Sequence, residues 1–475
     1  MEEEPALLHL LPHVVIFPLT VQGHINSMLK LAEILSLAHL KVTFITTLHN
    51  YDRLTRFTDF HTRFQKYPDF ELKTVPEFLP IDHSLGLRLV DVMESMDLVT
   101  KPVFKRIILE SSPPVNCIIM DGILAFVSEI ANDLRIPFIH FRTISACSFW
   151  AYFSVLDIVQ AAQLPIKGEE DMDRIITKVP GMEIFLRCRD LPSFCRVNDT
   201  QDPNLQILTK ETRKSSQAEA LILNTFEDLE GPILSQICKE CPKIHAIGPL
   251  HELLKTKTQE SYQSSNSLRQ VDRTCITWLN TQPLQSVLYI SFGSITMVTK
   301  DQLMEFWHGI VSSKKQFLWV IRADSISNME DIPEQFQEGP KENGYVVKWA
   351  PQEEVLAHKA IGGFLTHSGW NSTLESIVAG VPMICWPFFA DQQVNSRFVS
   401  EVWKLGLDMK DVCDRQIVEK MVNDLMVDRR EVFVKEAARM TELARKSVAE
   451  GGSSSSNLNH LIQDIRLMCM KSQEN

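Results

Sequence analysis

The sequence predicts an α/β protein in which two domains face each other across a cleft. Short apolar runs of the kind that parallel sheets bury alternate with segments of helical periodicity, and this alternation occurs in both halves of the chain. A polar stretch rich in Ser, Gln and Lys, residues 251–274, separates the two series and is expected to be the interdomain linker. The length of 475 residues is also too great for a single core. Two α/β sandwiches that face each other across a cleft are the architecture that satisfies these observations.

The first domain is expected to cover residues 1–250. It opens with an apolar run at residues 13–17, a helical segment that starts at His24, and a second apolar run at residues 42–45. Further strands of this domain are expected at residues 115–120, 137–141, 221–225 and 246–249. Ligands of open parallel sheets bind at the carboxyl ends of the strands. His24, in the turn after the first strand, and Asp121, just past another strand, therefore belong to the candidate site.

The second domain is expected to cover residues 275–455 and to repeat the pattern. Its strands are expected at residues 286–290, 317–321, 344–348, 363–366 and 383–386. Thr299 and Gln302 form a capping box that predicts the start of a helix. A Gly- and Ser-rich segment at residues 451–456 breaks the last long helix. Residues 456–475 are expected to form a helix that packs back on the first domain.

Composition argues against several classes of partner. The formal net charge of -12 repels phosphate backbones and anionic lipids, so neither nucleic acid nor a membrane surface is an expected partner. The opening Met-Glu-Glu-Glu has the wrong charge for a signal peptide, and no run of about 18 apolar residues predicts stable membrane insertion. Ten scattered cysteines fit a reducing compartment, and the one CxxC pair, Cys238 and Cys241, has no second pair at zinc spacing. A cytoplasmic protein is the expectation.

Residues 349–392 contain a candidate nucleotide site. Within this stretch an apolar strand ends in a tight Ser-Gly turn, and a helix opens at Asn371. A helix N-terminus presents free N–H groups and a positive dipole end, which can receive a diphosphate. Glu375, one turn further on, can accept hydrogen bonds from ribose hydroxyls, and Trp349 offers a flat face for a base. The alternative is a capped helix with a packed tryptophan, but three separate strand-end loops carry groups that suit a nucleotide.

The same residues, 349–392, resemble the signature box of the plant secondary-product glycosyltransferases, within the uridine diphosphate (UDP) glycosyltransferase family. The characteristic positions of that box are all filled, by Trp349, Pro351, Gln352, Val355, Leu356, His358, Gly363, Phe364, His367, Gly369, Trp370, Asn371, Ser372, Glu375, Gly380, Val381, Pro382, Trp386, Pro387, Asp391 and Gln392. Supporting similarity extends over residues 22–26, 246–250, 278–279 and 291–294. The resemblance implies the GT-B type of fold, in which two facing Rossmann-like domains enclose the site and the C-terminal one holds most of the donor.

The resemblance also implies a role for each residue at a matching position. Trp349 would stack on uracil, the Ala350 backbone would hydrogen-bond to it, and Glu375 would hold the ribose. Further donor contacts are implied for Gln352, for the phosphate-holding residues Ser294, His367, Asn371 and Ser372, and for the sugar-facing residues Trp370, Asp391 and Gln392. Thr143, just past the strand expected at residues 137–141, is a further candidate for contact with the donor sugar. A glutamine at position 392 is associated with glucose, whereas histidine is associated with galactose. The implied co-substrate is therefore UDP-glucose, and no further cofactor is expected.

The catalytic pair that the resemblance implies is His24 and Asp121. An imidazole is suited to accept a hydroxyl proton at neutral pH, and a carboxylate on its other ring nitrogen would fix the tautomer. Direct attack by the acceptor predicts inversion at the anomeric carbon, with the helix dipole and His367, not a metal, meeting the charge of the departing diphosphate. Metal-using glycosyltransferases carry an Asp-x-Asp at a strand end. Asp171 and Asp173 have that spacing, but they lie in an acidic run beside no clear strand and are expected in a solvated loop.

A small lipophilic metabolite is the expected acceptor, held mainly by the first domain. The candidate contacts are Gly23, Phe126, Arg142, Phe149 and Trp150, with Arg142 facing an acceptor carboxylate. The apolar members of this set are equally expected as plain core. The chain resembles the plant branch that includes terpenoid and iridoid glucosyltransferases, and phenolic acceptors stay open.

A monomeric enzyme is the preferred hypothesis, and a catalytically silent UDP-sugar-binding scaffold of a biosynthetic complex is the alternative. Such a scaffold would be expected to have lost the base, the acid that orients it, or a sugar contact. His24, Asp121, Asp391 and Gln392 are all present. A hydrolase or epimerase on the same fold would need a further acid/base pair, which the sequence does not show.

Overall fold

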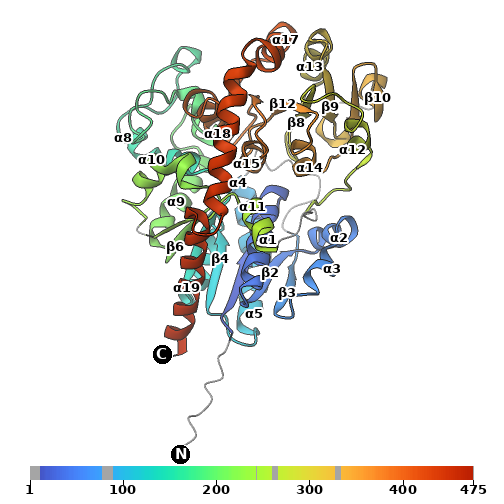
Figure 1. Ribbon diagram of the computed structural model, residues 1–475. Helices are drawn as coiled ribbons and strands as arrows, with labels where there is room; N and C mark the ends of the chain where they lie inside the picture. The colour runs from blue at the N-terminus through green and yellow to red at the C-terminus, as the bar shows by residue number, and fades with distance from the viewer. Residues whose placement is uncertain (1–10, 78–88, 242, 259–265, 327–332, 474–475) are drawn as a thin grey trace, which may run out of the picture.

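The computed structural model describes residues 11–77, 89–241, 243–258, 266–326 and 333–473, which form two α/β domains (Figure 1). The first domain is built on a seven-stranded sheet in the order β3-β2-β1-β4-β5-β6-β7, and all of its strand pairs are parallel. Its strands are β1 (His13–Phe17), β2 (Lys41–Thr47), β3 (Phe70–Val75), β4 (Cys117–Asp121), β5 (Phe138–Arg142), β6 (Ala220–Leu223) and β7 (Ile244–Ala246). Its helices are α1 (Gln22–Leu37), α2 (Leu48–Phe57), α3 (Phe60–Phe64), α4 (Leu89–Ser95), α5 (Lys101–Leu109), α6 (Ala125–Asp133), α7 (Ala146–Phe153), α8 (Val155–Gln160), α9 (Pro203–Arg213), α10 (Glu227–Ile237) and α11 (Leu250–Thr258).

The second domain carries another seven-stranded sheet, in the order β10-β11-β9-β8-β12-β13-β14. Only the edge pair β10–β11 is antiparallel. The strands are β8 (Val287–Ser291), β9 (Gln316–Val320), β10 (Gly339–Lys341), β11 (Gly344–Val347), β12 (Ile361–Thr366), β13 (Met383–Cys385) and β14 (Gly406–Asp408). The helices of this half are α12 (Thr274–Leu279), α13 (Lys300–Ser312), α14 (Gln352–Leu356), α15 (Trp370–Ala379), α16 (Gln392–Arg397), α17 (Arg415–Asn423), α18 (Arg430–Val448) and α19 (Ser453–Gln473). The predicted pair of Rossmann-like domains is confirmed.

Strand β1 explains why the parallel strands of the first sheet appear in the sequence as continuous apolar runs. Val14 and Ile16 pack into the core on one face of the first sheet, whereas Val15 and Phe17 pack into a separate core on the other face. Because helices cover both faces, every position along the strand must be apolar or paired. His13 fits that rule, since its buried ring hydrogen-bonds to Thr43 and to a backbone carbonyl.

Several element boundaries differ from the prediction. Strand β4 includes Asp121 as its last residue, so the carboxylate sits on the sheet edge itself. The last strand of the first domain, β7, lies earlier than the predicted residues 246–249, because it ends at Ala246. Beyond it, the chain turns in towards β6, where Gly248 donates its N–H to the Thr225 carbonyl at 2.7 Å. The edge strand β3 was not predicted, since its half-exposed Phe-Glu-Leu-Lys-Thr-Val sequence has no apolar run.

The segment expected as a linker, residues 251–274, is partly helical. Helix α11 covers its first residues and packs on α1, and Leu250, Leu253 and Leu254 join the core that α1 also lines. The spacing of these leucines is helical, but the polar residues around them hid the pattern. Residues 259–265 of this expected linker lie outside the described residues.

The last two helices connect the domains. Helix α18 packs on α15 of the second domain and on α10 and α11 of the first, and α19 then packs against β7 and β4 (Figure 1). Leu458, Leu461 and Ile465 are the buried residues through which α19 joins the core of the first domain. Helix α19 begins at Ser453, a few residues before the predicted start, because the break is confined to the residues around Gly451 and Gly452.

An apolar core runs without interruption from one domain into the other. Phe226 and Leu229 of the first domain belong to the same buried cluster as Trp370, Leu374 and Trp403 of the second. Both tryptophans also donate across the boundary, Trp370 to the Asn224 carbonyl at 2.8 Å and Trp403 to the Leu229 carbonyl at 3.1 Å. The two domains therefore share a packed apolar interface and are not joined by the connecting chain segments alone.

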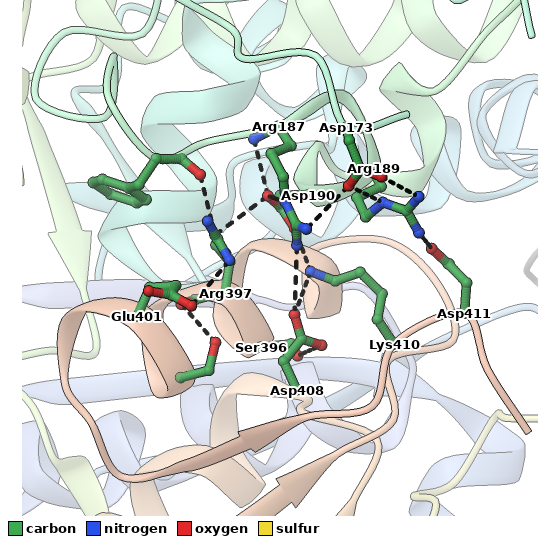
Figure 2. A network of polar contacts seen from close by, with 12 residues as sticks. Asp173, Arg187, Arg189, Asp190, Ser396, Arg397, Glu401, Asp408, Lys410 and Asp411 are labelled. Carbon is green, nitrogen blue, oxygen red and sulfur yellow. Dashed lines mark hydrogen bonds and ion pairs between the residues drawn. The ribbon is translucent and has the colours of Figure 1, made fainter. Parts of the chain in front are cut away.

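A buried ionic cluster adds to this interdomain contact (Figure 2). Asp190, from the first domain, is fully buried and pairs with Lys410 of the second domain and with Arg187 of its own. Arg397 of the second domain places Nε 3.4 Å from the same carboxylate, and Lys410 reaches Asp408 at 2.8 Å. Burial alone would raise the pKa of Asp190, but the hydrogen bonds and charges of Arg187 and Lys410 outweigh it and hold that pKa below its usual value.

The Asp-x-Asp spacing lies in the loop that precedes this cluster. Asp171 Oδ1 lies 3.3 Å from Arg174 Nε, and Asp173 Oδ1 lies 2.8 Å from Arg189 Nε. Both carboxylates are thus engaged with arginines of the same loop, and neither lies on a strand.

All ten cysteines lie in the described part of the chain and are free thiols. In the CxxC pair, Cys241 is buried and Cys238 is exposed. No helix among the described residues combines the length and the hydropathy that a membrane span requires.

Candidate active site

A cavity of about 580 Å³ opens between the domains at the carboxyl ends of both sheets. Two facing parallel sheets bring their strand-end loops to one place, which is why residues far apart in the sequence meet here. The predicted residues that line this cavity are Gly23, His24, Thr143, Ser294, Trp349, Ala350, Gln352, His367, Trp370, Asn371, Ser372, Glu375, Asp391 and Gln392.

His24 and Asp121 form a direct pair. Helix α1 begins with His24 in its first turn, and Nδ1 of His24 contacts Oδ2 of Asp121 at the end of β4. The imidazole is one-quarter exposed to the cavity, at 24%, whereas the carboxylate is 2% exposed behind it. With Nδ1–H donating to the carboxylate, the lone pair of the imidazole lies on Nε2, which suits a general base.

Asp121 is held in its ionised form. Burial works to raise the pKa of Asp121, but the charge and hydrogen bond of His24, the charge of Arg142 and the Leu19 N–H outweigh it, so that pKa lies below its usual value. The Leu19 N–H donates to the carboxylate at 3.2 Å. Thr143, predicted to face the donor sugar, lines the cavity and places its hydroxyl 2.9 Å from Nδ1 of His24.

The N-terminus of α15 points at the cavity from the second domain. Asn371 lies in its first turn, but both ends of its side-chain amide are engaged with α1: Nδ2 donates to the Gly23 carbonyl and Oδ1 accepts from Ser27, each at 2.8 Å. The amide therefore links the start of α15 to the turn that carries His24. Ser27 was not predicted, since nothing in the sequence pairs residues 344 positions apart.

His367 lies between two glycines at the end of β12. A Cβ at Gly293 would lie 2.4 Å from His367 Nε2, and one at Gly369 would lie 2.5 Å from it. Burial, reinforced by the nearby charge of Arg322, lowers the pKa of His367 to about 4. The ring is therefore neutral at physiological pH and can offer a hydrogen bond, but not a full charge, to an anion.

Trp349 and Glu375 also line the cavity. Trp349 donates from Nε1 to Ser267 at 2.8 Å, and Arg269 lies over the ring, 5.6 Å from its centroid. Gln352 Nε2 donates to Glu375 at 2.7 Å, which fixes the carboxylate towards the cavity. Burial, together with the nearby charge of Glu353, raises the pKa of Glu375 to about 7.

Asp391 and Gln392 lie at the start of α16, where the Ser148 hydroxyl of the first domain donates to the Asp391 carbonyl at 3.2 Å. Asn395 Nδ2 donates to Asp391 Oδ2 at 2.8 Å, and burial raises the pKa of that carboxyl. The backbone N–H groups of Phe388 and Phe389 donate to Gln392 Oε1 at 2.8 and 3.0 Å. Because its oxygen is occupied, Gln392 is left with Nε2 as a donor towards the cavity.

Four of the predicted acceptor contacts do not line the cavity. Phe126 packs in the core with its ring centroid 6.0 Å from that of Phe17, and Phe149 is fully buried. Trp150 stacks on a neighbouring phenylalanine and donates to a backbone carbonyl. Arg142 is 3% exposed and donates to the Gly122 carbonyl, so it does not present its charge to a ligand. Apolar periodicity does not distinguish a pocket wall from a core, and of this group only Gly23 reaches the cavity.

Other cavity-lining residues were missed by the sequence analysis. They are mostly polar groups on loops and on the ends of helices, and include Asn26, Lys255, Asn266, Ser267, Arg273 and Glu353. Four of these residues, Lys255, Asn266, Ser267 and Arg273, belong to the stretch that was expected to be a linker. No local pattern marks such residues, because their position depends on how the two domains meet.

Comparison with known proteins identifies relatives along the whole chain. A family model described as "UDP-glucoronosyl and UDP-glucosyl transferase" matches residues 264–441. A 7-deoxyloganetic acid glucosyltransferase of Catharanthus roseus is 54% identical over 473 residues, which cover 96% of this chain and 98% of the relative. A 7-deoxyloganetin glucosyltransferase of Gardenia jasminoides is 39% identical over 470 residues, 95% of this chain and 97% of the relative.

The fold has a solved counterpart in the crystal structure of Os79 from O. sativa in complex with UDP. That structure superimposes with a TM-score of 0.80 at 25% sequence identity and covers 95% of this chain and 100% of its own. Its similarity extends over both domains and therefore includes their relative placement. Identity above one half over nearly the full length of both chains shows common descent: this protein belongs to the plant UDP-glycosyltransferase family and is a glycosyltransferase of the hexosyl-transferring class.

Proposed function

We propose that the enzyme transfers glucose from UDP-glucose to a small lipophilic acceptor of the iridoid type, with inversion at the anomeric carbon. The observation that carries the proposal is the placement of His24. Its imidazole, backed by the buried carboxylate of Asp121, faces the same cavity as the N-terminus of α15 and the ring of Trp349. The base for the acceptor and the residues proposed to bind the nucleotide thus lie on opposite domains and face one cavity. This arrangement would hold the two substrates side by side for transfer.

The donor is proposed to lie along the second domain. Uracil would stack on Trp349, and the ribose hydroxyls would donate to Glu375. The diphosphate would lie at the N-terminus of α15, where free N–H groups and the helix dipole favour an anion. Neutral His367 and Ser294 would add hydrogen bonds, while Asn371 would contribute through its backbone, because its side chain is bound to α1.

Gly293→Ala is expected to weaken the binding of UDP by about tenfold or more. Gly293 has φ of 76°, a conformation that alanine adopts only under strain, and the new methyl group would meet the ring of His367. The ring would be pushed out of the proposed phosphate site. Isothermal titration calorimetry with UDP measures the effect directly.

The matched control for this substitution is Gly231→Ala. Gly231 lies in α10, and a Cβ there would meet nothing within 4 Å. Alanine is also the better helix former, so folding and UDP affinity should be preserved. Wild-type UDP binding by Gly293→Ala would show that His367 does not contact the phosphates.

The proposed chemistry is a single displacement. The acceptor oxygen gives its proton to Nε2 of His24 as it attacks the anomeric carbon, and the bond from that carbon to the β-phosphate oxygen breaks. UDP leaves with the bonding electron pair, and its charge is received by the N–H groups of α15. Because the nucleophile enters opposite the leaving group, the configuration inverts. This scheme requires no metal ion, and the one Asp-x-Asp spacing is engaged with arginines instead.

The acceptor class is inferred from the relatives. The relative named for 7-deoxyloganetic acid is 54% identical, whereas the one named for 7-deoxyloganetin is 39% identical. The acid is therefore the preferred acceptor of this proposal. Buried Arg142 does not supply the cation that an acid would favour, so any such group must come from elsewhere in the chain.

The proposal is tested with purified protein, UDP-glucose and a panel of iridoid, terpenoid and phenolic acceptors. We expect glucoside formation to be fastest with 7-deoxyloganetic acid, slower with 7-deoxyloganetin, and weak with UDP-galactose as donor. Mass spectrometry detects the product, and the anomeric proton coupling in its NMR spectrum gives the configuration. UDP binding without transfer to any acceptor, and without slow donor hydrolysis, would instead support a silent scaffold.

A further inference from the structure

A cluster of charged side chains lies behind the proposed ribose site, where the domains meet. Lys30 on α1 forms an ion pair with Glu353 on α14 of the other domain. The lysine is 5% exposed, so its charge is satisfied inside the interface. Lys255 on α11 lies 4.0 Å from the second oxygen of Glu353 and 2.6 Å from Glu252. The first domain thus surrounds the carboxylate of Glu353 with cations.

Glu375 is the second carboxylate of this cluster. It lines the main cavity and also a small pocket that it shares with Lys30 and His251. Gln352, the neighbour of Glu353 in the chain, donates to Glu375 and to Ser372 at 2.7 and 2.8 Å. The ion pair across the interface therefore lies directly beside the carboxylate that would receive the ribose.

The charged and titratable groups that act on Glu375 are Lys30 from α1, Lys255 from α11, Tyr289 from β8 and Glu353 from α14. His251 of α11 lines the small pocket beside it, and Glu252 pairs with Lys255. Burial raises the pKa of Glu375 most, and the charge of Glu353 raises it further. Lys30, Gln352 and Lys255 act in the opposite sense. The charges of Lys30 and Lys255 outweigh burial at Glu353 and lower its pKa, so Glu353 keeps its charge. Burial lowers the pKa of His251 to about 4, so that ring is neutral at physiological pH.

We propose that Lys30 is a positioning residue for the donor: its ion pair with Glu353 sets the charge with which Glu375 meets the ribose hydroxyls. A residue of the acceptor domain would in this way tune the affinity of the other domain for the nucleotide. The proposal rests on the proposed function, since it takes Glu375 as the ribose contact.

The direction of the effect follows from the chemistry of the carboxyl group. An ionised carboxylate accepts hydrogen bonds from two ribose hydroxyls, whereas the protonated form loses one acceptor. Affinity for the donor should therefore fall as the pH drops below the pKa of Glu375. Removing the positive charge of Lys30 raises that pKa, and removing the negative charge of Glu353 lowers it.

The experiment measures Kd for UDP-glucose by calorimetry, without acceptor, from about pH 5.5 to about pH 8.5. UDP-glucose is the probe because neither of its phosphates titrates in this range, unlike the terminal phosphate of UDP. Lys30→Met should move the midpoint of the pH dependence up by about one pH unit, and Glu353→Gln should move it down by a similar amount. At a pH of about 6.5, Lys30→Met should bind about tenfold more weakly than wild type.

The opposite signs of the two shifts separate this proposal from a structural role. Loss of packing would weaken binding in both variants without moving the midpoints apart, and that result would overturn the proposal. Lys30→Arg keeps the charge and should keep the wild-type profile, and Glu375→Gln should abolish the pH dependence. If Lys30→Met does not fold, Glu353→Gln alone must still lower the midpoint. Failure of the wild type to bind UDP-glucose would instead overturn the proposed function.

Discussion

His24→Ala is expected to lower kcat by about 10³-fold and to leave the Kd for UDP-glucose within about twofold of wild type. The imidazole of His24, on the first domain, presents the lone pair of Nε2 to the cavity and has the buried carboxylate of Asp121 behind it. Without it, the acceptor hydroxyl must lose its proton to water. The nucleotide would be little affected, since its proposed contacts lie on the second domain. Single-turnover kinetics and calorimetry on the same preparation separate the two effects.

The control for His24→Ala is His460→Ala. His460 is exposed on α19 and does not line the cavity, so its loss should change neither parameter. Asp121→Asn provides a second comparison. Its amide can donate to Nδ1, which would place the ring proton on Nε2 and block the base, so a loss of about 10³-fold or more is expected with the donor affinity kept. Undiminished turnover by His24→Ala with several acceptors would remove this residue from the mechanism.

Local physical chemistry explains why much of this site could be predicted from the sequence. A buried parallel strand leaves an apolar run, and the residue after it lies at the ligand-binding edge of the sheet. His24, Asp121 and the helix start at Asn371 were placed in this way. The signature box then supplied the proposed donor residues, because one contiguous stretch of sequence folds into α14, β12, α15 and β13, and the loops between these elements line the cavity.

What could not be predicted depends on contacts between distant segments. The amide of Asn371 was expected to hold phosphate, but it is bound to Gly23 and Ser27 of the other domain. Phe149 and Trp150 were expected as pocket walls, yet they belong to a helix buried on all sides. Hydrophobicity predicts that a side chain is buried, but not whether core residues or a bound ligand cover it, so the acceptor contacts could not be predicted from the sequence.

The ionic cluster around Asp190 leads to the largest expected change in stability. Asp190→Asn should lower the free energy of unfolding by about 3 kcal/mol, because it leaves the buried ammonium of Lys410 and the partly buried guanidinium of Arg187 with one carboxylate fewer. A buried cation that has lost its partner carries a desolvation penalty, and this penalty is larger than the net stabilisation that the intact ion pair provided. The two domains also meet at this point, so the loss should appear in the transition that separates them. Calorimetric scans and urea unfolding, followed by tryptophan fluorescence, measure it.

Asp173→Asn is the matched control. Asp173 pairs with Arg187, as Asp190 does, but the Asp173 side chain is 66% exposed. Screening by water limits such a pair, and a change below about 0.5 kcal/mol is expected. Lys410→Met on its own should be destabilising, but added to Asp190→Asn it should cost much less, because it removes a cation that has already lost its partner. If Asp190→Asn were no more harmful than Asp173→Asn, the buried cluster would contribute nothing to holding the domains together. The cavity that His24 and the start of α15 share would then depend on the apolar core and the tryptophan hydrogen bonds alone.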